Sequence, residues 1–260
     1  MTFEKFHNRL VIDAKLVAVT PIFIGARADS YKPGEVNGAC VKDAYGKPYI
    51  PGSSLKGVLR AFLSSILHEP IDSKVDASFG SKDLRDKMVN KAKKDNPEEY
   101  ENMKDNEILA RLIYKDSTTV ERLFGSMVMA GKVKIADSTL VEERVVPDVR
   151  NGVAIDRDTH TAIGGALFET ETVPAGTVFS FGVSAENLTL EEAELFEKLM
   201  AYFADGNITV GGRSRAGLGS VELQEVKVTL YRRGTDGFPV YEEISGGIGG
   251  IKGAVECLKT

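Results

Sequence analysis

The chain has 260 residues, a formal net charge of −5 and 42% hydrophobic residues, which is enough for one large or two small domains with a core. Two cysteines and three scattered histidines are too few to predict a disulfide framework or a zinc cluster. No apolar run approaches the ~20 residues of a membrane span. Residues 1–15 lack the apolar core of a signal peptide, so we expect a cytoplasmic protein.

The charge is unevenly distributed along the chain. Residues 1–68 hold nine Lys or Arg against five Asp or Glu, whereas residues 184–200 hold five Glu against one Lys. The acidic net charge argues mildly against nucleic acid as a partner. Because a binding site depends on its local charge, the chain can still carry a basic groove.

The first quarter of the chain predicts a strand followed by a loop. Apolar residues alternate with polar ones over residues 9–23, which is the pattern of a half-buried strand. Residues 25–38 are polar and contain Pro33-Gly34, so we expect a loop there. Short extended pieces at 39–41 and 48–50 flank a turn at 43–46.

The strongest local signal is a turn that opens into an amphipathic helix, Pro51-Gly52-Ser53-Ser54-Leu55-Lys56-Gly57. The helix is expected from about Ser53 to His68, where apolar residues recur at helical spacing. Ser53 or Ser54 is the expected N-cap. The free N–H groups of such a helix start, with Lys56 and Arg60 nearby, suit an anion such as phosphate. The alternative is an ordinary capped core helix.

Two known sequence motifs partly match this segment, but each lacks residues that its function requires. Gly52 and Gly57 have the glycine spacing of a P-loop, but Val58 stands where that loop needs lysine. Ser53 and Lys56 match the S-x-x-K of penicillin-recognising enzymes, yet the chain has neither S-D-N nor K-T-G. A nucleotide cofactor and acyl transfer are therefore poorly supported.

The middle of the chain changes character. Residues 69–117 are charge-dense and poor in apolar residues, so we interpret them as an insertion of short surface helices, for example Lys82–Lys94 and Asp105–Tyr114. A strand is expected over Gly131–Val141, with a further candidate strand over Arg144–Val149.

The following segment, residues 150–174, is rich in Thr and Gly and has no helical period. We expect it to form a long β-hairpin that projects from the body. A strand over Thr177–Ala185 returns the chain to the core. The tail, residues 235–260, contains paired glycines and is expected to be loosely ordered.

A second clear helix is predicted from Thr189 to Phe203, where Thr189 and Glu192 are spaced as a capping box. A strand over Ser220–Tyr231 follows. The order of elements is β-α-β-β-α-β with insertions, which predicts a single α+β domain over residues 1–234 with a ferredoxin-like sheet and two helices on one face.

A glycine-rich loop, Gly211 to Gly219, is the second strong signal. Four glycines in nine residues let the backbone approach a ligand closely. Arg213 and Arg215 supply forked, charge-assisted donors that suit phosphate. The alternative is a tight turn with two exposed arginines.

Several other polar residues are candidates for a site. The carboxylates Asp29, Asp43, Asp156 and Asp158 can orient a ribose hydroxyl or act as a base, although turn or solvent roles are commoner. His160 can stack on a base or take part in acid–base chemistry, and the alternative is a solvated loop histidine.

Taken together, these segments resemble the RAMP superfamily of CRISPR-associated proteins, most closely the repeated backbone subunit of type III effector complexes. The resemblance implies a modified ferredoxin-like (RRM-like) domain with a thumb-like β-hairpin. The segments appear in the family's order over residues 20–219, and they are Thr20-Pro21-Ile22-Phe23-Ile24-Gly25, Val41-Lys42-Asp43, Ile50-Pro51-Gly52-Ser53-Ser54-Leu55-Lys56-Gly57, Leu123-Phe124-Gly125 and Gly211-Gly212-Arg213-Ser214-Arg215-Ala216-Gly217-Leu218-Gly219.

The resemblance implies that several copies line up along one CRISPR guide RNA, beside other type III Cas subunits, and present it to a complementary target RNA. The helix start and the glycine-rich loop would grip guide phosphates, and the hairpin would wedge between guide and target. Phosphate carries no sequence information, so any guide can be held. The residues assigned to RNA binding in this way are Lys42, Ser53, Ser54, Lys56, Arg60, Arg150, His160, Gly211, Gly212, Arg213, Ser214, Arg215 and Gly217.

One position departs from the family pattern. In cutting members an aspartate four residues before the position of Val41 supports metal-dependent cleavage of target RNA, and this chain has Asn37 there. An amide is a poorer partner for a hard cation than a carboxylate. The resemblance therefore implies that the subunit binds without cutting and holds no cofactor, with a divalent metal such as Mg²⁺ needed only if cleavage occurs. Asp29 is the catalytic candidate if the loop aligns differently.

Two rival functions remain within the same superfamily. One is a repeat-processing endoribonuclease, which generally uses a histidine and would here use His160. The other is a structural subunit that caps the assembly without gripping guide RNA. No membrane partner is expected in either case.

Overall fold

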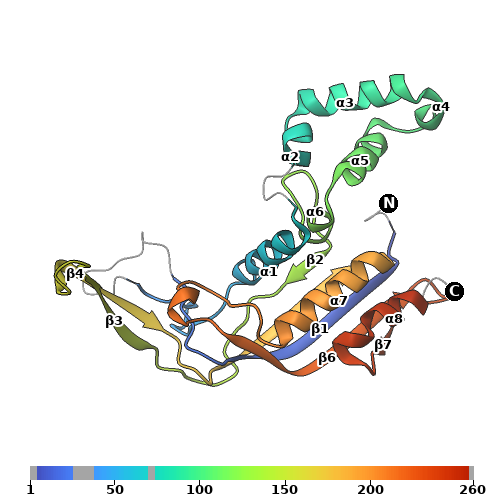
Figure 1. Ribbon diagram of the computed structural model, residues 1–260. Helices are drawn as coiled ribbons and strands as arrows, with labels where there is room; N and C mark the ends of the chain where they lie inside the picture. Colours follow the sequence, from blue (N-terminus) through green and yellow to red (C-terminus); the bar gives the residue numbers. More distant parts are fainter. Residues whose placement is uncertain (1–4, 26–37, 70–73, 258–260) are drawn as a thin grey trace.

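A computed structural model of the chain describes residues 5–25, 38–69 and 74–257 (Figure 1). Its centre is a five-stranded antiparallel sheet with the strand order β2-β5-β1-β6-β7. The predicted α+β class is therefore confirmed. The strands of this sheet are β1 (Asn8–Ala18), β2 (Val133–Ile135), β5 (Val178–Glu186), β6 (Val221–Arg233) and β7 (Pro239–Glu243).

The middle strand β1 explains why one face of the sheet is covered. Leu10, Ile12 and Leu16 are fully buried, whereas Arg9 and Asp13 are exposed. This alternation with a period of two places the apolar residues of a strand on a single face. Because β1 pairs with β5 on one side and β6 on the other, strands from both ends of the sequence meet at the centre.

Two helices cover the buried face, α1 (Gly52–Leu67) and α7 (Leu190–Ala204). The apolar faces of the two helices pack on the sheet and form one hydrophobic core with it. The helix residues in this core include Leu55, Leu59 and Leu63 of α1 and Phe196, Met200 and Phe203 of α7. The rings of Phe62 and Tyr202 stack with centroids 5.0 Å apart, so the two helices lie side by side.

The predicted capping box of α7 is confirmed. The Thr189 hydroxyl accepts the amide of Glu192, and the Glu192 carboxylate accepts the amide of Thr189. Each side chain thus satisfies one N–H group at the helix start. The same carboxylate is almost fully buried and pairs with Lys132, which joins the start of α7 to the segment that leads into β2.

The charged segment after α1 forms helices that project away from the sheet (Figure 1). The predicted helices Lys82–Lys94 and Asp105–Tyr114 are confirmed as α3 and α5. Two small apolar clusters, one around Ile108 and one around Phe79, hold these helices together. The helices are α2 (Lys74–Phe79), α3 (Lys82–Asp95), α4 (Pro97–Tyr100), α5 (Asp105–Asp116) and α6 (Thr119–Phe124).

Both ends of this helical segment are tied together by one carboxylate. Glu69, just after α1, accepts hydrogen bonds from the amides of Thr119 at 3.1 Å and Val120 at 3.0 Å. These amides belong to the first turn of α6, where a negative charge is favourable. The segment therefore leaves and re-enters the body at one point.

The expected hairpin is present as a separate two-stranded sheet of β3 (Asp148–Ile155) and β4 (Ala162–Thr172). In Figure 1 it extends from the end of the main sheet that lies opposite the two chain termini. The candidate strand over Arg144–Val149 is not present with these bounds. Strand β3 begins at Asp148, so only Asp148 and Val149 of the predicted range belong to a strand.

Two other predicted strands are shorter than expected. The first, predicted over residues 9–23, ends at Ala18, and beyond it Ile22 makes an isolated bridge to Val173. The strand predicted over residues 131–141 keeps only Val133–Ile135. After Ile135 the chain stays beside β5 with irregular pairing, through the bond from the Ala136 amide to the Gly182 carbonyl and the bridge from Leu140 to Phe179. Ser138 bridges to Ile50.

The expectation of a loosely ordered tail is wrong for its described part, residues 235–257. Strand β7 pairs with β6, and a short helix, α8 (Ile251–Glu256), packs on α7. Ile251 is 0% exposed and Val255 is 3% exposed, so both belong to the core. The paired glycines form a 3-10 turn, Gly247–Gly250, that brings α8 onto the body.

Candidate nucleic-acid interface

The segment from Pro21 to Gly25 brings together the glycine-rich loop and the base of the hairpin. On one side, the amide of Gly212 donates to the Phe23 carbonyl at 2.8 Å, and the amide of Gly219 donates to the Pro21 carbonyl at 2.9 Å. On the other side, Ile22 and Val173 exchange backbone hydrogen bonds of 2.9 and 2.8 Å. Three segments that are far apart in the sequence thus meet at one end of the sheet (Figure 1).

Most of the glycines in the loop serve this internal packing. Gly211 has φ +85°, and a Cβ there would lie 2.3 Å from the Phe23 carbonyl oxygen. Gly219 has φ +88°, and a Cβ there would lie 2.2 Å from the Val210 carbonyl oxygen. Only Gly217, with φ +81° and no atom within 4 Å of its ideal Cβ, faces open space. The glycines are therefore explained by the fold before any ligand is considered.

The two arginines of the loop are exposed around a 3-10 turn, Ser214–Ala216. Arg213 adopts the left-handed region with φ 60°, and its guanidinium lies 5.5 Å from the centroid of the Phe23 ring. A guanidinium that lies over an aromatic face is restricted in its orientation. The loop thus presents Arg213 in a preferred direction beside Arg215.

At the hairpin base, Lys42 is paired with Glu171. The Lys42 Nζ lies 2.7 Å from Glu171 Oε1, and the second oxygen of that carboxylate accepts the Cys40 amide at 2.9 Å. The Cys40 thiol donates to the Glu171 carbonyl at 2.9 Å, and burial raises the pKa of the Cys40 thiol to about 11. A phosphate at Lys42 would have to compete with the Glu171 carboxylate.

The start of α1 differs from the prediction. The helix begins at Gly52 with Pro51 as its N-cap, and no side chain caps it, so neither Ser53 nor Ser54 has the predicted capping role. Instead, the Gly52 amide donates to the carboxylate of Asp137 at 2.7 Å. The reason is that Gly52 lies against the backbone of Ile135 and Ala136, which brings the following Asp137 to the helix start.

Lys56 and Arg60 lie one turn apart on α1, and both are half-buried. Burial, and then the neighbouring Arg60 charge, lower the pKa of Lys56. The Arg60 guanidinium donates to the Gly125 carbonyl at 3.0 Å. Because an anion between two like charges would relieve their repulsion, this pair is a suitable place for a phosphate oxygen.

The two hairpin residues predicted to bind RNA lie apart from each other. Arg150 is exposed on β3 opposite Thr170, whereas His160 lies in the turn that joins β3 to β4. His160 has φ 54° and donates its amide to the Asp156 carbonyl at 3.0 Å. Hydrogen bonds from Thr159 lower the pKa of Asp156 and explain that carboxylate as a turn residue.

The catalytic candidate Asp29 and the departing position Asn37 both lie outside the described residues. Within the described part of the chain, no group of three or more His, Cys, Asp or Glu side chains is placed to hold a metal ion. Asp43 is engaged in its own turn, where it accepts the amides of Tyr45 and Lys47.

Sequence reasoning missed three residues that organise this region: Phe23, Asp137 and Glu171. Phe23 lay inside a motif, but its role as a platform for Arg213 depends on a contact across the chain. Asp137 and Glu171 sit in short polar stretches without a local pattern. Asp137 follows β2 and Glu171 lies near the end of β4, and no residue beside either of them marks its distant partner.

Comparison with known proteins places the chain in a family. A model described as the RAMP superfamily matches residues 15–222, which is most of the 260-residue chain. The chain therefore belongs to the RAMP superfamily, and the resemblance inferred from its motifs is confirmed.

A curated relative makes the comparison more specific. The chain is similar to the CRISPR system Cms endoribonuclease Csm3 of Methanocaldococcus jannaschii, with 24% identity over 226 residues that cover 85% of this chain and 81% of the relative. No helix among the described residues is both long and apolar enough to span a bilayer.

Proposed function

We propose that this protein is a backbone subunit of a type III CRISPR ribonucleoprotein and that it binds guide RNA at the face built by α1, the glycine-rich loop and the hairpin. The family assignment and the similarity to Csm3, a protein named as part of a CRISPR system, support this proposal. Neighbouring copies, other type III Cas subunits and a complementary target RNA would be its partners.

The observation that carries the proposal is the joint attachment of the glycine-rich loop and the hairpin to the Pro21–Gly25 segment. The exposed Arg213 and Arg215 therefore belong to a loop that is bonded to the same segment as the hairpin base. Arginine forks bind phosphate oxygens in a bidentate manner without reading bases. The site is therefore suited to an RNA backbone of any sequence.

The acidic net charge is compatible with this role. Each subunit would contribute only a few phosphate contacts, and affinity would accumulate because neighbouring subunits hold the same RNA. A single copy in isolation is expected to bind RNA weakly and with strong salt dependence.

Whether this subunit cuts RNA is a separate question, because its relative is named an endoribonuclease. We propose that the protein binds target RNA without cleaving it, since Asn37 replaces the aspartate of cutting members. Asp29 is the residue on which cleavage would depend if this proposal is wrong.

The proposal is tested by co-expressing the chain with a guide-RNA array and its neighbouring genes, and by measuring the guide RNA that co-purifies. The double variant Arg213→Ala/Arg215→Ala should lose guide RNA and lower the slope of log affinity against log salt by about 2. The matched control is Arg232→Ala/Arg233→Ala, which removes two exposed arginines of β6. Equal RNA affinity in all three proteins would favour the capping subunit that does not grip RNA.

The same preparation tests cleavage of a complementary RNA with Mg²⁺. We expect intact target RNA bound to the guide. Regular cuts that disappear in Asp29→Ala would overturn the non-cutting proposal. Cleavage of repeat RNA by the isolated protein, lost in His160→Ala, would identify the processing endoribonuclease instead.

A further inference from the structure

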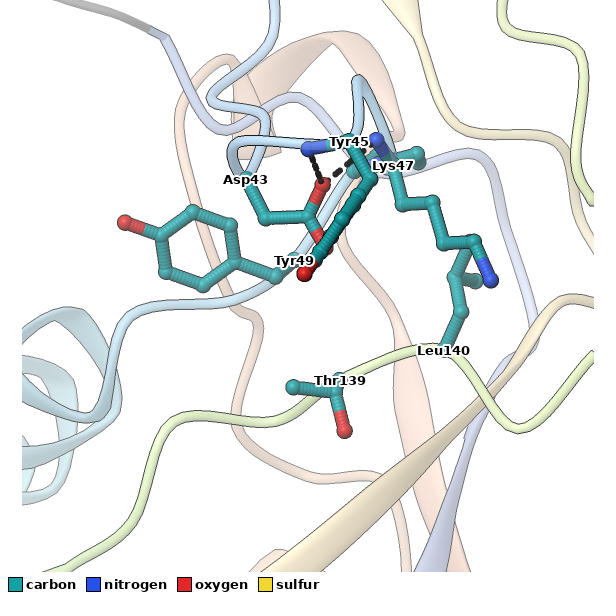
Figure 2. Close-up of a pocket in the computed structure, with 7 residues that line it drawn as sticks. Asp43, Tyr45, Lys47, Tyr49, Thr139 and Leu140 are labelled. Atoms are coloured by element: carbon teal, nitrogen blue, oxygen red, sulfur yellow. Dashed lines mark hydrogen bonds between the residues drawn. The ribbon is translucent and has the colours of Figure 1, made fainter.

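A hydrogen-bonded turn presents an aromatic side chain to solvent. None of the RNA-binding residues proposed above belongs to this turn. In the turn of residues 43–47, the Asp43 carboxylate accepts the amides of Tyr45 at 2.9 Å and Lys47 at 2.8 Å, and the Asp43 amide donates to the Lys47 carbonyl at 2.8 Å. Gly46 supplies φ +76°. These bonds fix the backbone that carries Tyr45 (Figure 2).

Tyr45 is 89% exposed and stands between two hollows that it lines together with Lys47. The first hollow has a volume of about 420 Å³, and Tyr49, Thr139 and Leu140 lie on its walls (Figure 2). The second has a volume of about 680 Å³ and is lined by residues 143–147. An exposed aromatic side chain on a fixed backbone turn can receive a planar ring without reorganisation of that backbone.

The hollows also contain two cations. Lys47 lines both hollows and Arg144 lines the second, and neither has an ion-pair partner among the described residues. One carboxylate, Glu143, lies on the wall of the second hollow. The carboxylate in the turn, Asp43, is already bonded to two amides. The local charge therefore favours an anion near Lys47.

The turn is continuous with the proposed RNA interface. Lys42 bridges to Pro48 at the base of the turn and is paired with Glu171 of the hairpin. On the other side, the chain passes through Ile50 into the start of α1. The Tyr45 turn thus lies between the hairpin base and α1.

We propose that Tyr45 is a stacking platform for an unpaired base of single-stranded RNA, with Lys47 and Arg144 contacting the phosphates on either side of that base. This inference rests on the proposed function and adds a subsite to it. An aromatic face accepts any base, so the subsite would hold RNA without selecting its sequence.

A protein partner is the competing occupant, since Val141 and Val146 are also exposed nearby. Lys47 favours RNA, because interface cores are depleted of lysine. An RNA backbone requires neutralising charge, which Lys47 and Arg144 both supply. The experiment below separates the two occupants.

The test compares the complex carrying Tyr45→Ala, Tyr45→Phe or Tyr241→Ala in binding a fluorescein-labelled single-stranded 30-nucleotide RNA. Tyr241 is the matched control, because it is 75% exposed on β7. Base stacking contributes ~1–3 kcal/mol, so Tyr45→Ala should weaken binding about tenfold. Tyr45→Phe, which keeps the ring, and Tyr241→Ala should bind as the parent does.

A second readout locates the contact directly. RNA containing 4-thiouridine should crosslink to the peptide that carries Tyr45, and this crosslink should be lost in Tyr45→Ala. Unchanged affinity and no crosslink at the turn would overturn the subsite while leaving the proposed function intact. Loss of self-association with unchanged RNA affinity would assign Tyr45 to a protein contact. If the parent complex binds no RNA, the result contradicts both the proposed function and the proposed subsite.

Discussion

The carboxylate of Asp137 accepts a hydrogen bond of 2.7 Å from the amide of Gly52, the first residue of α1. A negative charge of the protein itself thus occupies part of the helix start at which the sequence suggested a phosphate. Any RNA phosphate at α1 would share the helix terminus with Asp137, and Lys56 and Arg60, one and two turns further on, become the more suitable contacts.

The first prediction concerns this cap. Asp137→Ala should destabilise the protein by about 1 kcal/mol, because it removes both the acceptor and the charge at the helix start. Asp137→Asn keeps an acceptor and should cost less. Urea denaturation measures both variants. If both variants have the free energy of unfolding of the parent protein, the hydrogen bond from Gly52 to Asp137 contributes nothing to stability.

The second prediction concerns the buried pair of Lys132 and Glu192. Their side chains are 1% and 4% exposed, and Lys132 also donates to the Asn187 carbonyl at 2.9 Å. Removing one partner leaves a buried charge, so Lys132→Met should cost ~3–5 kcal/mol. The double variant Lys132→Met/Glu192→Gln should recover part of this loss, as measured by chemical denaturation.

The double variant should not regain the full stability of the parent protein, because Glu192 also accepts the Thr189 amide in the capping box. A single variant that loses less than about 1 kcal/mol would show that the charge is rehydrated rather than buried.

The third prediction concerns thiol reactivity. Cys40 is buried with a pKa of about 11, whereas Cys257 is exposed. Since the thiolate is the reactive form, a thiol reagent at pH 8 should modify Cys257 in the native protein and Cys40 only after unfolding in urea. Mass spectrometry of digested peptides checks the site. Rapid native labelling of Cys40 would contradict its burial.

The raised pKa of Cys40 also predicts a pH dependence. The thiol stays neutral in the folded protein up to a higher pH, whereas in the unfolded chain it ionises near its ordinary pKa of 9.0. Its contribution to stability is therefore complete below about pH 9 and is lost as the pH rises towards 11. Cys40→Ala should show a smaller decrease in stability over this interval than the parent protein.

The fourth prediction separates the glycines. Gly211→Ala and Gly219→Ala place a Cβ 2.3 and 2.2 Å from carbonyl oxygens at positive φ, so each should lower the melting temperature strongly. In Gly217→Ala the new Cβ has no close neighbour, and only the backbone strain at φ +81° remains. This variant should lower the free energy of unfolding by about 1 kcal/mol. Gly57 in α1 is the control, because its Cβ would meet nothing within 4 Å. Gly57→Ala should stabilise the protein by ~0.5–1 kcal/mol.

A result in which Gly211→Ala and Gly217→Ala melt alike would mean that the close approach to Phe23 is not maintained in solution. Scanning calorimetry of the four variants makes this comparison under one set of conditions.

Elements whose signals are local could be predicted from the amino-acid sequence alone. Helical spacing located α1, and a charge-dense composition poor in apolar residues indicated α3 and α5. The Thr189–Glu192 spacing specified the capping box of α7. The hairpin and the glycine-rich loop were also evident from composition. These features depend on residues a few positions apart, so the local sequence is sufficient.

The ion pairs and hydrogen bonds between these elements, and the position of the tail, depend on contacts between distant parts of the chain. Asp137 and Gly52 are 85 positions apart, and Lys42 and Glu171 are 129 positions apart, so no local pattern reveals either pair. The glycines of the tail suggested a loosely ordered segment, yet Ile251 and Val255 are buried against the core. Such contacts follow from the path of the whole chain, because burial of apolar surface against distant elements overrides weak local propensity.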